Sequence, residues 1–145
     1  MSETLGSLCD KLTVVILKFH HAPDGDMLWK LTVQKDQLVA EINRFVKDAT
    51  DGKIPCEQLQ FAANKIYKKE GNEMMPLPTN DIGWTVGELA RINCHLWHDQ
   101  EKVYNIQDIP PDKKDDLMKS LAHLNLRRNQ CIDKINLLFA ESLKW

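Results

Sequence analysis

TLGSLCDKLTVVILKFHH, residues 4–21, decides the fold, because it aligns without a gap on TVGELARINCHLWHDQEK, residues 85–102. Both segments begin with the pattern T-x-G-x-L. A second pair follows in the same order, since LTVQKDQLVAEIN (31–43) aligns with LNLRRNQCIDKIN (124–136). Similarity between segments in the same order indicates a repeated structural unit. We therefore predict a duplicated hairpin.

The apolar residues of these segments recur at helical spacing. The alternating steps of three and four residues are those of a heptad seam. The two seams consist of Leu28, Leu31, Lys35, Leu38, Ile42 and Phe45, and of Leu117, Leu121, Leu124, Arg128, Cys131, Ile135 and Leu138. Pro23 and Gly25 break the first hairpin between its helices. The sequence predicts an all-α fold, with hairpins over about 4–48 and 85–143 forming a four-helix bundle in one domain.

Local signals mark the predicted helix starts. Thr85 and Glu88 have the spacing of a capping box, in which each side chain binds the other residue's backbone amide. Thr4 is expected to cap the first helix in the same way, with Ser7 in the place of the glutamate. Pro110 and Pro111 favour the start of the last helix.

The connector between the hairpins, about 54–84, has a different pattern. IPCEQLQFAANKIYKKEG (54–71) suggests a shorter amphipathic helix. Pro76 and Pro78 exclude a helix from the next stretch, NEMMPLPTNDIGW (72–84). That stretch is too apolar for a loop that is only solvated, so we expect it to pack across the bundle or to form an oligomer contact. The interface candidates are Met74, Met75, Leu77, Ile82 and Trp84.

Composition narrows the class of protein. The chain has 145 residues and a net charge of −2, with acids and bases interspersed. This distribution of charge forms no basic patch of the kind that binds nucleic acid or an anionic membrane. The four cysteines stand singly, which indicates reduced thiols in a cytoplasmic protein. We expect a homo-oligomer or a protein partner.

A basic residue interrupts each seam, Lys35 in the first hairpin and Arg128 in the second. An unpaired charge is costly to bury, so each requires a partner or a path to solvent. Three interpretations remain open: a polar layer that fixes helix register, an arginine that binds a carboxylate or phosphate ligand, or side chains that reach solvent. The partners considered for Arg128 are Asp99, Glu101, Asn93 and Gln100.

The histidines raise the question of a metal. His95, His98 and Asp99 lie near one another on the predicted helix, although His98 should point outward. A metal site needs three or four converging ligands, and His20 and His21 are the nearest other suppliers. We therefore predict no cofactor, with a divalent metal at His95, His98 and Asp99 as the weaker alternative.

The pattern N-x-x-L-W-H-x-x-E (93–101), followed by L-N-x-x-R-N-x-x-I-x-x-I (124–135), resembles a bacterial helical family catalogued as domain of unknown function 4254. Trp97-His98 and Arg128-Asn129 carry most of the similarity. Because the family has no agreed activity, the resemblance implies a helical fold and no reaction.

Two functions follow as hypotheses. The first is a non-enzymatic helical module that associates with itself or with a partner. The second is a small all-α enzyme or a small-ligand or nucleotide-binding protein, with a polar pocket where Arg128 meets the face of residues 95–99. The ligand-binding candidates are Arg128, Asn129, Asn93, Trp97, His98, Asp99 and Lys35.

Overall fold

The computed structural model describes residues 3–61 and 75–143. These residues form four α-helices and two single 3-10 turns, and no strand occurs among them. The elements are α1 (Leu5–His20), α2 (Gly25–Thr50), η1 (Cys56–Gln58), α3 (Ile82–Tyr104), η2 (Ile106–Asp108) and α4 (Pro111–Ser142). The predicted all-α class is confirmed. None of these helices is apolar enough over a sufficient length to cross a membrane.

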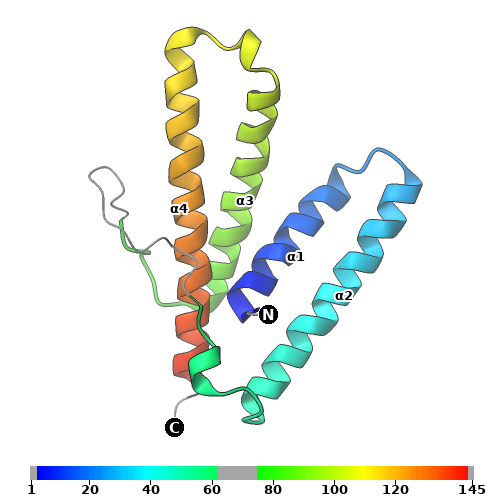
Figure 1. Ribbon diagram of the computed structural model, residues 1–145, viewed down its shortest axis with the longest axis vertical. Coiled ribbons are helices and arrows are strands. Elements are labelled where there is room, and N and C mark those ends of the chain that lie inside the picture. Colours follow the sequence, from blue (N-terminus) through cyan, green and yellow to red (C-terminus); the bar gives the residue numbers. More distant parts are fainter. Residues whose placement is uncertain (1–2, 62–74, 144–145) are drawn as a thin grey trace.

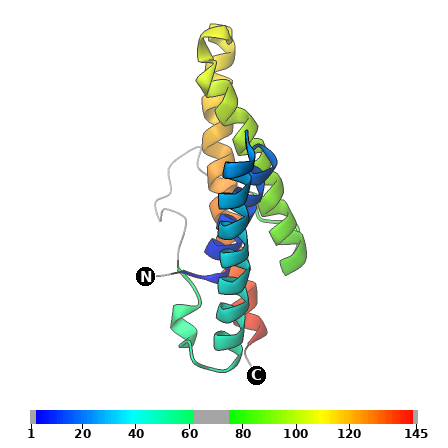
Figure 2. The ribbon, with the colours of Figure 1, turned by 90° about the vertical axis from the view of Figure 1, so that its right-hand side faces the viewer.

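The helices pair as two hairpins, and α1 lies at the junction between them. In Figure 1, α3 and α4 stand side by side, and the hairpin of α1 and α2 leans away from them. Helix α1 packs on each of the other three helices, whereas α2 has extensive contact with α1 alone. The α3–α4 hairpin also extends past the end of the other (Figure 1 and Figure 2). A closed four-helix bundle is therefore not confirmed within one chain.

The core lies at the end of the molecule where α1, α3 and α4 meet. Leu89 of α3 and Ile135 of α4 are completely buried there, and Leu59 joins them from the segment after η1. Burial of such side chains contributes about 1.5–3 kcal/mol each relative to exposure. This cluster holds the two hairpins together at one end, and α1 also contacts α3 near its own C-terminal end, where the His21 and Trp97 rings stack.

Gly6 allows α1 and α4 to approach closely. Its backbone N–H donates to Asn136 Oδ1 over 2.7 Å. A Cβ atom at this position would collide with the carbonyl oxygen of Ile132 and lie 2.9 Å from Asn136 Oδ1. The glycine of the T-x-G-x-L pattern therefore has a packing role in α1. Gly87, its counterpart in α3, has open space around it.

Of the two predicted capping boxes, one is confirmed and one is wrong. Thr4 caps α1, and Ser7 completes the capping box. In α3, however, the helix begins a turn earlier, at Ile82, with Asp81 as its N-cap. Thr85 is fully buried and its Oγ1 donates to the Asp81 carbonyl over 2.8 Å. Asp81 therefore caps α3 in place of the predicted Thr85.

The connector is described in part. The predicted helix over 54–71 is represented by η1 at Cys56–Gln58, and its residues from 62 onward lie outside the described residues, as does Met74. Residues 75–81 are non-helical, as the prolines predict. Ile82 and Trp84, expected in the loop, belong to α3 instead. The other helix limits agree well with the sequence, and α4 has 32 residues from Pro111.

Replacing Gly6 tests the close contact between α1 and α4. We expect Gly6→Ala to lower the free energy of unfolding by about 1–3 kcal/mol, because the added methyl group overpacks a rigid backbone contact. Gly87→Ala is the matched control, and there a better helix former at an open position should stabilise the protein by about 0.5–1 kcal/mol. Urea denaturation of both variants measures the difference, and equal effects would contradict the packing.

Candidate functional site

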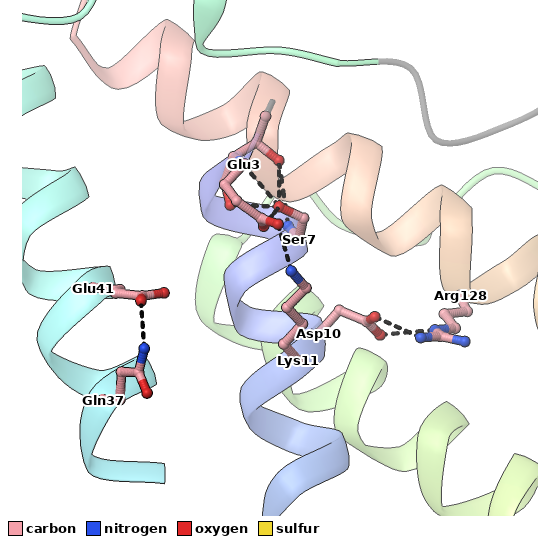
Figure 3. Close-up of polar contacts among 8 residues, drawn as sticks. Glu3, Ser7, Asp10, Lys11, Gln37, Glu41 and Arg128 are labelled. Carbon is pink, nitrogen blue, oxygen red and sulfur yellow. Dashed lines mark hydrogen bonds and ion pairs between the residues drawn. The ribbon is translucent and has the colours of Figure 1, made fainter. Parts of the chain in front are cut away.

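An ion pair between a buried aspartate and a half-buried arginine joins the two hairpins. Arg128 of α4 donates from Nε to Asp10 Oδ1 over 2.8 Å and from Nη2 to Asp10 Oδ2 over 2.6 Å. Figure 3 shows Asp10 reaching from α1 to Arg128 in this bidentate arrangement. Asp10 is 7% exposed, and the Arg128 side chain is 33% exposed. Two parallel bonds between charged groups are among the strongest polar contacts in proteins.

Two further side chains complete this polar layer. Asn93 of α3 donates from Nδ2 to Asp10 Oδ1 over 2.9 Å and to Thr13 Oγ1 over 2.8 Å. Thr13 Oγ1 in turn donates to the Asp10 carbonyl over 2.8 Å. Three helices therefore contribute to one network, and the buried carboxylate is compensated on both of its oxygens. This arrangement can fix the register of the helices.

The sequence identified Arg128 and Asn93 but not the residue that links them. Asp99, an expected partner of Arg128, instead accepts from Ser120 Oγ over 2.8 Å, which corrects that pairing. Asp10 was missed because it is one acid inside an apolar helix, where neither spacing nor composition distinguishes it. One consideration could have identified Asp10. If the first hairpin packs on the second, α1 has to supply a charge opposite Arg128.

A groove opens beside the ion pair. It has a volume of about 310 Å³ and lies between α1, α2 and α4. Its lining residues are Asp10, Lys11, Val14, Val15, Lys18, Gln34, Gln37, Leu38, Glu41 and Arg128. The hydrogen bonds that Arg128 donates to Asp10 raise the pKa of the guanidinium, despite the opposing effect of burial, so the guanidinium remains charged.

This groove differs from the pocket that the sequence predicts. Trp97, His98 and Asp99 do not line it, because they lie on α3 and the groove faces α2. Asn129 is half-buried and is not part of its lining. Lys35 is also outside it, with 39% of its side chain exposed and an ion pair to Asp36 at 3.5 Å. Arg128 is therefore the ligand candidate that lines this groove, whereas His98 lines a separate pocket of about 320 Å³ where α3 meets η2.

The histidine-rich part of α3 meets the end of α1. The rings of His21 and Trp97 stack with their centroids 4.6 Å apart, and the His98 ring lies 6.5 Å from His21. His98 is exposed, as predicted. Trp97 Nε1 donates to Glu101 Oε1 over 2.7 Å. Across residues 3–61 and 75–143, no three His, Cys, Asp or Glu side chains converge to hold a metal, so His95, His98 and Asp99 are not brought together in this way.

The two cysteines whose pKa is shifted, Cys9 and Cys131, are not suited to act as nucleophiles. Burial raises the pKa of Cys9, and the adjacent Asp10 adds to the effect. Burial raises the pKa of Cys131 to about 11, with a contribution from Glu88. A nucleophilic cysteine requires the opposite shift. All four cysteines are unpaired thiols.

No family model, curated protein or solved structure matches the chain. The resemblance of residues 93–101 and 124–135 to the bacterial helical family stays a prediction.

Breaking the ion pair tests its contribution to stability. We expect Arg128→Met to lower the free energy of unfolding by about 3 kcal/mol, because Asp10 is left buried and without its cation. The double variant Asp10→Asn/Arg128→Met should recover part of this loss, since no unpaired charge remains. Lys30→Met removes an exposed ion pair with Asp26 and should cost at most about 1 kcal/mol. If the double variant is no more stable than Arg128→Met, the electrostatic explanation is wrong.

Thiol labelling provides an independent check on the fold. At pH 8 a thiol with a pKa of about 11 is ionised in roughly one molecule in a thousand, and Cys131 is completely buried. We expect dithiobis-nitrobenzoate to label the exposed Cys56 in the native protein and Cys131 after unfolding in urea. Peptide mass spectrometry assigns the sites. Labelling of native Cys131 at the rate of Cys56 would contradict the described core.

Proposed function

We propose that the protein is a non-enzymatic, self-associating helical module in which the first hairpin of one chain packs on that of a second copy. The observation that carries this proposal is that α2 has extensive contact with one helix, whereas a helix in a four-helix bundle contacts two neighbours. The predicted four-helix bundle would then be completed between chains. The four unpaired thiols support a cytoplasmic location.

The seam of α2 has its apolar residues only partly covered. Leu31 is buried, while Leu28, Leu38, Ile42 and Phe45 are half-buried. A heptad seam is stabilised when each of its side chains enters a hole on a facing helix. At one end of the seam Ile42 and Phe45 pack against the core, beside Phe139 of α4, and at the other end Leu28 is half-buried.

One flank of the first hairpin is the surface we assign to the second copy. We call it the apolar flank, and it consists of Leu12 and Ile16 on α1 and of Leu28 and Val39 on α2. Ile16 is 37% and Val39 is 41% exposed, and the two leucines are half-buried. Because a twofold dimer uses the same patch on both partners, an apolar patch is complementary to itself.

The connector offers a second apolar surface, the one predicted from the sequence. Met75 is 80%, Ile82 37% and Trp84 38% exposed, whereas Leu77 packs against the core. The Met75 carbonyl accepts from Arg127 over 2.9 Å and from Gln130 over 3.0 Å, which attaches this segment to α4. These residues belong to a loop and one helix start, so they offer less continuous area than the two helices of the apolar flank.

A charge on the apolar flank should separate the copies. We expect the wild-type chain to sediment as a dimer and Val39→Glu and Ile16→Glu to sediment as monomers, because each places a carboxylate in an apolar contact. Sedimentation equilibrium at several concentrations measures the mass, and circular dichroism verifies that the helices persist.

Met118→Glu and Tyr104→Glu are the controls, since both residues are more exposed than Val39, Tyr104 is the last residue of α3, and Met118 lies in the early part of α4. They should remain dimers. A wild-type chain that stays monomeric throughout would overturn the proposed function. A dimer that dissociates with Trp84→Glu but not with Val39→Glu would assign the contact to the connector instead.

A further inference from the structure

We propose that the groove beside Asp10 and Arg128 binds a small zwitterion of the α-amino acid class with an apolar side chain. Its two walls carry opposite charge. Lys18 on α1 and Arg128 on α4 supply cations, and Glu41 on α2 supplies a carboxylate. A ligand with a carboxylate and an ammonium group can pair with both walls at once.

Arg128 retains donors for a ligand carboxylate. A guanidinium has five N–H donors, and the two bonds to Asp10 leave three of them without a partner in the described part of the chain. The bidentate contact also holds the guanidinium plane in place, so a ligand would meet donors that are already oriented. Lys18 is exposed at the same wall and has no ion-pair partner among residues 3–61 and 75–143.

The opposite wall retains acceptors for a ligand ammonium. Gln37 Nε2 donates to Glu41 Oε1 over 3.2 Å, which leaves Glu41 Oε2 and Gln37 Oε1 available. Figure 3 shows both side chains on the side of α2 that faces α1. Lys11 does not compete for Glu41, because it pairs with Glu3 at the start of α1.

The size and the remaining lining define the rest of the ligand. Val14, Val15 and Leu38 provide apolar surface between the charged walls. The volume of about 310 Å³ is at the lower end of the range for small-molecule sites, so the groove suits a compact ligand. Aliphatic amino acids combine this size with both charges and an apolar side chain.

This site is separate from the self-association surface. Val39 lies two residues from both Gln37 and Glu41, and Ile16 two residues from both Val14 and Lys18. Two residues correspond to about 200° around a helix, so the groove and the apolar flank occupy opposite sides of the hairpin. Ligand binding can therefore be tested, and can fail, independently of dimerisation.

Isothermal titration calorimetry of the full chain tests the assignment. The ligands are alanine, valine, leucine, isoleucine, methionine and phenylalanine, together with two truncated forms of leucine: 4-methylpentanoate, which lacks the amine, and 3-methylbutylamine, which lacks the carboxylate. We expect at least one amino acid to bind, and leucine to bind at least about tenfold more tightly than either truncated form.

Two variants separate a designed site from a general charge effect. Glu41→Gln should weaken leucine binding about tenfold and leave 4-methylpentanoate unchanged, because it removes the ammonium partner alone. Asp36→Asn removes an acid from α2 outside the groove and should change neither. Absence of binding by all six amino acids would overturn the proposal. Equal affinity for leucine and 4-methylpentanoate would also overturn it, since a site that recognises only the carboxylate gains no affinity from the ammonium group.

Discussion

The ion pair between Asp10 and Arg128 is the contact on which the relation between the two hairpins depends. It joins α1 to α4, and Asn93 extends it to α3. A buried charge pair contributes little net stability compared with apolar packing, but losing one partner is severe. The pair therefore selects one packing of the hairpins more than it stabilises the chain. Gly6 acts with it, since a close contact of α1 on α4 is required to bring Asp10 within reach of Arg128.

This constraint leaves α1 at the centre and α2 at the edge. Because one side of α1 packs on α3 and α4, α2 packs on the other side of α1. No other described helix contacts α2 to a comparable extent. The same geometry produces both proposals. One flank of the α1–α2 hairpin is apolar and suits a second copy, while the other leads to the charged groove that ends at Arg128.

Much of the fold could be predicted from the sequence because helices follow local rules. The breaks at Pro23 and Pro110, the cap at Thr4 and the seams gave the helices within a few residues. Prediction failed where two local caps compete and where a long-range contact decides. The early start of α3 depends on Asp81 competing with Thr85, and the partner of Arg128 lies 118 residues away on α1. No spacing rule reports which helix faces that arginine. The site was therefore half predicted, with Arg128 and Asn93 found and Asp10 and the α2 wall missed.

The distance between the same residue in two copies tests the central claim, that a second chain completes the bundle. Spin labels at Val39→Cys, in a chain whose native cysteines are replaced by serine, allow this distance to be measured by pulsed electron resonance. Packing of the two apolar flanks predicts an intermolecular distance within about 20 Å, or two interaxial spacings of packed helices. The same label at Met118→Cys should give a longer distance. No intermolecular coupling at position 39, at concentrations where the chain sediments as a dimer, would contradict the account.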